Sequence, residues 1–387
     1  MPETSIDRAR GYHDELTEFR RDIHAHPELG LEEHRTAERV AGKLAAWGIE
    51  VHRGIGKTGV VGVLRNGEGP SIGLRADMDA LPMQEQTNLA YSSRNPGRMH
   101  ACGHDGHTTM LLGAAKYLAD TRNFKGTVNF IFQPGEEGAG GALAMLEDKL
   151  FERFPCDAIF GMHNRPGMPV GQFGITPGLA MAGAAMFDIV ITGKGGHGAR
   201  PEVAIDPVVA AFHVGAALQS IVSRNVPPHD MAVLSICRMH GGDAYNVIPQ
   251  TATLGGTVRT FKNETMQLIE TNMKRLASSI AAGFGAEAEV DFRFVFAPLM
   301  NDLNHTRAFA DAAAGLVGDA KVDRNKPPAN ASEDFSFMLQ KVPGAYINIG
   351  NGEDSAPVHH PAYNFNDAAI PYGVALFADI VERKLAR

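Results

Sequence analysis

The chain is poor in cysteine, in tryptophan and in long apolar runs. It contains 3 cysteines and 1 tryptophan among 387 residues. Such an odd, sparse set of cysteines argues against a disulfide framework and fits a reducing compartment, so we expect a cytoplasmic protein. No uninterrupted apolar run approaches the ~20 residues of a membrane-spanning helix, and the polar N-terminal stretch does not resemble a signal peptide. We therefore expect no membrane association.

An excess of positive charge is also lacking. The 36 lysines and arginines are outnumbered by 44 aspartates and glutamates, which leaves a formal net charge of −8. This balance provides no basic footprint for nucleic acid, so we expect no nucleic-acid partner. A hydrophobic share of 44% and a charged share of 21% exclude wholesale disorder. At ~100–200 residues per domain, the length predicts two or three domains.

Helices and strands are expected to alternate in both end segments of the chain. The predicted strands lie at residues 60–64, 71–74, 127–132, 158–162 and 345–349. The predicted helices lie at residues 5–21, 32–47, 105–119, 141–150, 306–317, 335–339 and 368–385. Such alternation is typical of an α/β fold with a mostly parallel sheet covered by helices. We expect residues 1–182 and 298–387 to form one domain.

The order of elements changes between these segments. Strands are predicted at residues 187–191, 232–239, 251–260 and 288–294, and helices at residues 207–223 and 264–282. This is the order β-α-β-β-α-β of a ferredoxin-like unit, in which both helices cover one face of a small sheet. We therefore predict an inserted domain at residues 183–297.

The densest group of potential metal ligands lies at residues 100–107, just before a predicted helix. It contains His100, Cys102, His104, Asp105 and His107. Cys102 and His104 are two positions apart, so in an extended segment their side chains point the same way. Thiolate and imidazole suit zinc and the later first-row metals. A buried cysteine beside surface histidines is the alternative, and the concentration of ligating groups disfavours it.

Two adjacent carboxylates, Glu136 and Glu137, follow a predicted apolar strand and are enclosed by Gly135 and Gly138. Neighbouring side chains point in different directions, so one carboxylate can bind a metal while the other acts as a general base. A solvated acidic turn is the alternative. The apolar strand that precedes the turn favours the functional interpretation.

Further candidate ligands also follow predicted strands. They are Asp77 and Asp79, His163, and the pair His359-His360. Ligands of open α/β sheets collect outside the carboxyl ends of the strands. Two cations ~3.5–4 Å apart repel one another and need anionic ligands around them. Together these loops predict a two-metal centre that activates a water molecule.

The motifs resemble the aminoacylase-type zinc peptidase superfamily, and most closely its branch of hippurate hydrolases and indoleacetyl–amino acid hydrolases. They occur in the family's order and span nearly the whole chain. The matching phrases are His24-Ala25-His26-Pro27-Glu28-Leu29, Arg75-Ala76-Asp77-Met78-Asp79-Ala80-Leu81-Pro82, His100-Ala101-Cys102-Gly103-His104-Asp105, Gln133-Pro134-Gly135-Glu136-Glu137, Gly161-Met162-His163, Gly195-Gly196-His197, Asn246-Val247-Ile248-Pro249 and Ser332-Glu333-Asp334-Phe335. The resemblance implies a catalytic domain interrupted by a lid or dimerisation domain.

The resemblance also implies residue roles. The implied ligands of two divalent metal ions are Cys102, His104, Glu137, His163 and His359. Glu136 would be the general base. His197, often from the partner subunit in this superfamily, would stabilise the oxyanion. Asn246 and Arg259 would bind the substrate's carboxylate. Asp77, Asp79 and Asp105 would support the metal ligands, and of these Asp79 and Asp105 would orient a ligating histidine.

Some details stay open at this stage. The peptidase branch has a histidine where this chain has Asp77, so the metal set must differ. Zinc or manganese is expected, and cobalt or nickel remains possible because affinity alone does not select the metal. His359 is preferred as the last ligand, and His360 is the alternative. His24 and His26 receive no role, because a structural contact with Glu28 or Glu32 is as reasonable an interpretation as a catalytic one.

The expected reaction is hydrolysis of N-acyl amino acids, hippurate-like or indoleacetyl-conjugate-like, to a carboxylic acid and a free amino acid. A homodimer through residues 183–297 is expected from the resemblance. The alternatives are a metallo-aminoacylase or deacetylase, a carboxypeptidase-like dipeptidase, and a thiol hydrolase with Cys102 as nucleophile and His104 as base. A binding protein without activity is a further alternative, although Glu136 is present.

Overall fold

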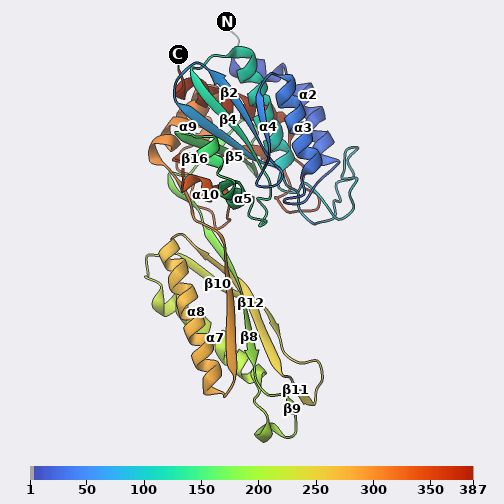
Figure 1. Cartoon of the computed structure of the whole chain (residues 1–387), viewed down its shortest axis with the longest axis vertical. Helices are drawn as coiled ribbons and strands as arrows, with labels where there is room; N and C mark the ends of the chain where they lie inside the picture. The colour runs from blue at the N-terminus through green and yellow to red at the C-terminus, as the bar shows by residue number, and fades with distance from the viewer. Residues whose placement is uncertain (1–3, 387) are drawn as a thin grey trace. The chain divides into compact units, whose positions relative to one another are not determined.

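The alternating end segments form one sheet in the computed structural model, which describes residues 4–386. The 8-stranded sheet has the order β1-β2-β4-β3-β5-β16-β6-β15 (Figure 1). Its strands are β1 (Glu50–Ile55), β2 (Gly59–Asn66), β3 (Ser71–Asp77), β4 (Gly126–Gln133), β5 (Ala158–Pro166), β6 (Phe173–Ile175), β15 (Val322–Asp323) and β16 (Gly344–Gly352). The central strands β4, β3, β5 and β16 run parallel, which confirms the predicted mostly parallel sheet.

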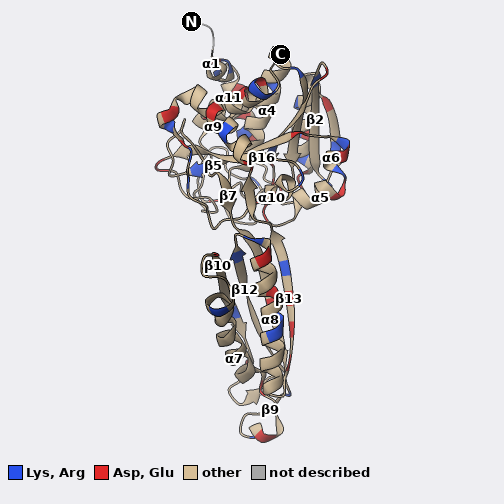
Figure 2. Cartoon of the chain, turned by 90° about the vertical axis from the view of Figure 1, so that its left-hand side faces the viewer, with Lys and Arg blue, Asp and Glu red and all other residues tan. Residues whose placement is uncertain are grey.

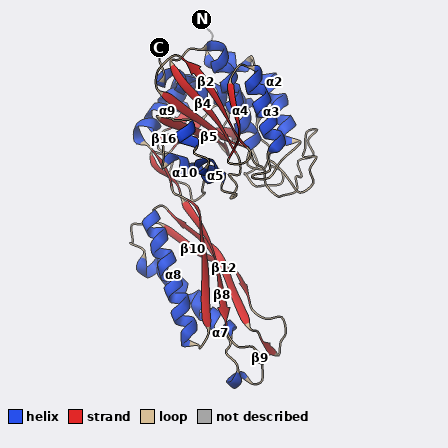
Figure 3. Cartoon of the chain, viewed as in Figure 1, coloured by secondary structure: helices blue, strands red, loops and turns tan. Residues whose placement is uncertain are grey.

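Helices cover this sheet, as Figure 3 shows. They are α1 (Ser5–Arg10), α2 (His13–His24), α3 (His34–Ala46), α4 (His104–Thr121), α5 (Gly141–Glu147), α6 (Leu150–Arg153), α9 (Leu303–Val317), α10 (Phe335–Leu339) and α11 (Ile370–Lys384), with short turns η3 (Asp319–Lys321) and η4 (Asp367–Ala369). Helix α4 is buried along nearly its whole length. Its first residue is His104, so the packed core fixes the start of the predicted ligand segment.

Two predicted helices are in fact broken. The expected helix 5–21 divides into α1 and α2 around Gly11, where α1 ends. The expected helix 141–150 divides into α5 and α6, because Lys149 adopts a left-handed conformation with φ 61°. Helix α9 begins three residues earlier than predicted, because the Asp302 side chain accepts hydrogen bonds from the first free N–H groups.

The inserted segment forms a sheet of its own, in the order β10-β12-β8-β13 with antiparallel pairing throughout. Its elements are β8 (Gly183–Thr192), α7 (Pro207–Ser220), β10 (Ala232–His240), β12 (Thr251–Thr260), α8 (Asn263–Gly283) and β13 (Glu287–Phe296), with a short 3-10 helix η1 (Pro201–Val203) and a short π-helix η2 (Ile221–Asn225). Phe187, Ile189 and Ile191 are buried, whereas Met186 and Val190, which point to the opposite face of the strand, are exposed. The predicted β-α-β-β-α-β order with one covered face is confirmed.

The chain divides into two compact units. The smaller unit comprises Met181–Leu299 and Pro328–Glu333, and the remainder forms the larger unit. The sequence placed the insertion at residues 183–297 and did not assign the second of these segments to it. That segment joins the smaller unit because the Ala182 N–H donates to the carbonyls of Ala329 and Ala331, both at 3.1 Å.

Two short strand pairs were not predicted. β9 (Gly196–His197) pairs with β11 (Val247–Ile248), and β7 (Gly178–Met181) pairs with β14 (Leu299–Asn301). Strands this short show no alternation that a sequence pattern could reveal.

Charges of both signs are interspersed along both units, as Figure 2 shows. No helix among residues 4–386 is both long and apolar enough to cross a lipid bilayer.

Candidate metal centre

Parallel strands bring the predicted ligands together in the larger unit. Asp77 is the last residue of β3, Glu136 and Glu137 follow β4, and His163 lies near the end of β5. Because β3 is paired in parallel with both β4 and β5, these carboxyl ends lie at one edge of the sheet. Cys102 joins them from the turn that leads into α4.

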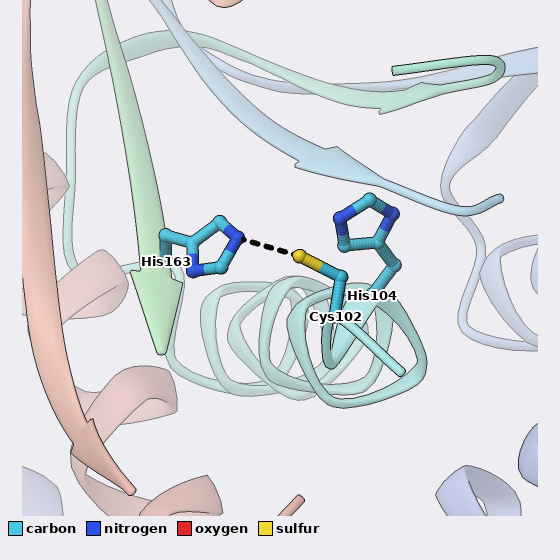
Figure 4. Close-up of side chains that lie close together, drawn as sticks. All are labelled: Cys102, His104 and His163. Atoms are coloured by element: carbon cyan, nitrogen blue, oxygen red, sulfur yellow. Dashed lines mark hydrogen bonds between the residues drawn. The ribbon is translucent and has the colours of Figure 1, made fainter. Parts of the chain in front are cut away.

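Cys102, His104 and His163 form a cluster whose ligand atoms lie within 4.8 Å of one another (Figure 4). The Cys102 Sγ lies 3.3 Å from the His163 Nε2. The other ring nitrogen of His163, Nδ1, lies 2.7 Å from the backbone carbonyl of Asn164. Because a carbonyl only accepts, Nδ1 carries the proton, and the lone pair of Nε2 faces the sulfur. This is the tautomer that a metal ligand needs.

His104 presents a free nitrogen to the same space. Its Nδ1 lies 3.1 Å from the Asp79 carboxylate. Its Nε2 is buried and has no hydrogen-bond partner among the described residues. The carboxylates of Glu136 and Glu137 each lie 4.0 Å from this nitrogen. A buried ring nitrogen without a partner is costly unless a ligand occupies its lone pair, so His104 fits a metal site.

Glu137 and His359 complete a second group with Cys102, again within 4.8 Å. The His359 Nε2 lies 3.1 Å from a Glu137 carboxylate oxygen. His360 points elsewhere, because its Nδ1 accepts the Ala362 N–H at 3.1 Å. The structure thus places His359, and not His360, beside Glu137. His359 adopts φ 63°, a conformation that costs energy for a residue other than glycine.

These donors fit a pair of divalent cations. Two overlapping groups share Cys102, and they offer thiolate, imidazole and carboxylate, which suit zinc, manganese and related ions. Burial, together with the Glu137 carboxylate, raises the pKa of the Cys102 thiol well above its ordinary value. The protein alone therefore keeps the thiol protonated, and a cation is needed to produce the thiolate.

The supporting aspartates differ from one another. Asp79 contacts the His104 ring and accepts the Glu137 N–H at 2.9 Å, as expected of a residue that orients ligands. Asp77 contacts the His107 Nδ1 at 2.6 Å and lies 3.9 Å from His104. The His107 Nε2 accepts the Asn164 N–H at 2.9 Å, so both ring nitrogens of His107 are used and it has no lone pair for a metal.

Asp105 makes no side-chain hydrogen bond to a predicted histidine ligand within the described residues, so the prediction that it orients one of them is wrong. Its carboxylate lies 2.9 Å from His24 and 3.3 Å from Arg20, both fully buried. Sequence analysis left His24 without a role. Burial alone would lower the pKa of His24, but hydrogen bonds to Asp105 and Glu85 outweigh it and raise this pKa to about 9. His24 is thus a buried cation that joins helix α2 to the start of α4.

The remaining predicted residues lie in the smaller unit. His197 pairs with Val247, and the Gly198 N–H donates to the Asn246 carbonyl at 2.8 Å, so His197 and Asn246 are neighbours. They lie near the start of β12, whereas Arg259 lies near its end, opposite Ala184. Eight residues of strand separate Arg259 from Thr251, on the order of 25 Å at ~3.3 Å per residue. Within one chain, Asn246 and Arg259 therefore cannot bind the same carboxylate. The joint role predicted for them requires Asn246 of one chain and Arg259 of another.

Arg259 lines a cavity of about 220 Å³ in the smaller unit. The other cavity walls include Val222, Met231, Phe261 and Asn330. Its guanidinium donates to the Thr257 hydroxyl and to the Val258 carbonyl, and no carboxylate of residues 4–386 pairs with it. Burial lowers the pKa of Arg259. A half-buried guanidinium without an anionic partner is suited to bind an anionic ligand.

Comparisons with known proteins agree with this geometry. Residues 73–383 match the model of peptidase family M20/M25/M40. The chain is 45% identical to the hippurate hydrolase of Campylobacter jejuni over 372 residues, which cover 96% of this chain and 97% of that protein. It is 43% identical to an N-acetylcysteine deacetylase of Bacillus subtilis, with 96% and 97% covered. The crystal structure of the Bacillus subtilis YXEP protein, described as a dinuclear metal binding peptidase from the M20 family, is similar with a TM-score of 0.84, 38% identity, and 97% and 99% covered.

Proposed function

This chain belongs to peptidase family M20/M25/M40 and is an amide-bond hydrolase, and we propose that it cleaves N-acyl amino acids to a carboxylic acid and a free amino acid. The observation that carries the proposal is the convergence of Cys102, His104 and His163 within 4.8 Å, with Glu137 and His359 beside them. These five residues would hold two divalent cations. Bound there, the cations would polarise the amide carbonyl and lower the pKa of an attacking water toward ~7.

Glu136 would move the proton. It is buried, and its carboxylate lies 4.0 Å from the His104 Nε2, whereas its neighbour Glu137 contacts His359. Glu136 would take a proton from the water that attacks the amide carbon and deliver it to the leaving nitrogen. Of the two adjacent carboxylates, Glu137 would be a metal ligand and Glu136 the general base.

Arg259 would bind the carboxylate of the amino-acid half of the substrate. Its planar guanidinium can make two parallel hydrogen bonds to a carboxylate, and it borders the cavity described above. The apolar cavity walls suit an amino-acid side chain that packs beside that carboxylate.

His197 and Asn246 would act in the site of a second copy of the chain. They lie on the order of 25 Å from Arg259 along β12, too far to contact the same small substrate, at ~3.3 Å per residue. In a dimer with two-fold symmetry, each chain can present this end of its smaller unit to its partner. There His197 would donate a hydrogen bond to the oxyanion, a contribution of about 3–4 kcal/mol for single donors elsewhere.

Deacetylation is a second candidate. The relatives named above act on a benzoyl and on an acetyl conjugate at nearly the same identity to this chain, so the size of the acyl group stays open. A thiol mechanism is less well supported, because burial and nearby carboxylates raise the pKa of Cys102 and disfavour the reactive thiolate.

Chelation and reconstitution test the proposal. The purified protein is stripped of metal, reloaded with Zn²⁺, Mn²⁺, Co²⁺ or Ni²⁺, and assayed on hippurate, indoleacetyl-amino acids, N-acetyl-amino acids and dipeptides. We expect activity on at least one N-acyl amino acid that disappears with the metal and returns on reloading. Full activity after complete metal removal would contradict the metal mechanism, and activity on dipeptides alone would contradict the substrate class.

A further inference from the structure

Asn164 follows His163 in β5 and is almost fully buried. Its side-chain amide contacts three other segments, one of them α4, where the His107 Nε2 lies 3.0 Å from the Asn164 Nδ2. The Nδ2 donates to the backbone carbonyl of Cys102 at 2.6 Å, and the Oδ1 accepts the Tyr363 hydroxyl at 2.7 Å. Its backbone is used as well, because its carbonyl accepts from the His163 Nδ1 and its N–H donates to the His107 Nε2.

These contacts join the segments that carry three of the proposed metal ligands. The carbonyl of Asn164 fixes the His163 ring so that Nε2 faces the Cys102 sulfur. The Asn164 amide holds the main chain from which the Cys102 thiol projects. Tyr363, fully buried, lies four residues after His359, so its bond to Asn164 anchors the segment that carries this histidine.

The packing around Asn164 leaves little freedom. Gly103, between Cys102 and His104, adopts φ +94°, and a Cβ there would lie 2.4 Å from the Asn164 Nδ2 and 2.5 Å from the Tyr363 hydroxyl. The backbone at Gly103, between two predicted ligands, therefore packs directly against the side chains of Asn164 and Tyr363. A shift of the asparagine side chain would displace both Cys102 and His104.

We propose that Asn164 is a positioning residue of the metal centre, which sets the geometry of Cys102, His163 and His359 through the contacts above. The inference rests on the proposed two-metal function. Partners that orient metal ligands typically change metal affinity by roughly 10- to 100-fold when they are removed. We expect a loss of this size for Asn164→Ala. We expect a smaller loss for Tyr363→Phe, which removes only the contact to the Asn164 Oδ1 and leaves the contacts of Nδ2 to Cys102 and His107 in place.

Asn129→Ala is the matched control. Asn129 is an equally buried asparagine in the same unit, and its Nδ2 donates to the Pro155 carbonyl at 3.0 Å, in a segment without predicted ligands. For each full-length variant, the dissociation constants of Zn²⁺ and Mn²⁺ are measured by competition with a chromogenic chelator. The thermal unfolding of the metal-free protein is measured in parallel.

The positioning role predicts weaker metal binding in Asn164→Ala and unchanged binding in Asn129→Ala, even where both lower the unfolding temperature. Equal metal affinity of wild type and Asn164→Ala would overturn the inference. If Asn164→Ala does not fold, Tyr363→Phe decides by the same criterion. A wild-type protein that binds neither ion would refute the metal centre itself. Tight metal binding without hydrolysis of any N-acyl amino acid would contradict the proposed substrate and leave the role of Asn164 intact.

Discussion

Glu136 and Glu137 are adjacent in the chain and yet have different surroundings. Glu137 contacts His359 and its main chain is held by Asp79, whereas Glu136 lies near the free nitrogen of His104. Sequence alone suggested that the two carboxylates divide their roles. Which one contacts another predicted ligand became visible only in the structure.

Glu136→Gln tests the proton-transfer role at the residue scale. The amide has nearly the same shape but cannot accept a proton, so we expect kcat to fall by roughly 10²- to 10⁴-fold, the usual contribution of a general base. Metal content, measured by elemental analysis on the same sample, should stay at the wild-type level. Near-normal turnover with bound metal would remove Glu136 from the mechanism.

Gly103 shows how a single missing side chain permits the ligand segment to pack. In Gly103→Ala the new Cβ meets a left-handed backbone and the Asn164–Tyr363 pair. We expect about 1–2 kcal/mol of backbone cost and a further ~1–3 kcal/mol from overpacking. The measurement is the free energy of unfolding from urea denaturation.

Gly97→Ala provides the control for that experiment. Gly97 has φ +74° but nothing within 4 Å of its Cβ position, so it isolates the backbone cost. Equal destabilisation of both variants would show that crowding at Gly103 is unimportant.

At the scale of elements, helices α2 and α4 are joined by buried charges. The two ring nitrogens of His24 in α2 contact Asp105 of α4 and Glu85. Arg20 of α2 contacts the same Asp105 carboxylate oxygen as His24 does. Buried charges must be paired to be tolerated, and here the pairing links the N-terminal helices to the segment that begins at His104. A motif that lacked an assigned role in the sequence therefore has a structural one.

This pairing predicts a specific pH dependence of stability. The pKa of His24 is raised to about 9, above its ordinary value of 6.5. Because the folded state binds the proton more tightly, its contribution is fully present below pH 6.5 and is lost as the pH rises through 9. We expect the stability difference between wild type and His24→Gln, from urea denaturation, to shrink between pH 6.5 and 9. A difference that is constant or grows over this range would contradict the charged pair.

On the scale of the whole molecule, the question is which chain completes each site. His197 and Asn246 lie near one end of β12 and Arg259 near the other. The proposed dimer would allow residues from two chains to form one site.

Mixing two inactive variants tests that arrangement. Glu136→Gln and His197→Ala homodimers should each be nearly inactive. After subunit exchange at equal amounts, we expect about a quarter of the wild-type rate, since half of the dimers are mixed and each then holds one intact site. The hydrolysis rate is measured before and after exchange, with size-exclusion chromatography to confirm a dimer. No recovery in verified mixed dimers would mean that His197 acts in its own chain.

The fold was largely predictable because strands buried on both faces and helices with one apolar face leave clear patterns. Those patterns predicted the main strands and the order of the inserted unit. They missed the edge strand β1, which is largely exposed, and the strands β6, β7, β9, β11, β14 and β15, which are too short to show a period. They also missed the breaks at Gly11 and Lys149, where a helix ends within the predicted range.

The sequence by itself determined which residue types could carry the chemistry, because cysteine, histidine and paired carboxylates next to glycine have few other uses in such a pattern. Only the tertiary structure decided how they are arranged. Parallel pairing of β3, β4 and β5 brings distant loops to one edge of the sheet. There the His104 Nε2 has no hydrogen-bond partner among the described residues, whereas both ring nitrogens of His107 are hydrogen-bonded. Asp105 contacts His24 instead of a predicted ligand. Distance along β12 separates Arg259 from Asn246, and no local pattern encodes that, because through-space proximity depends on how strands pair.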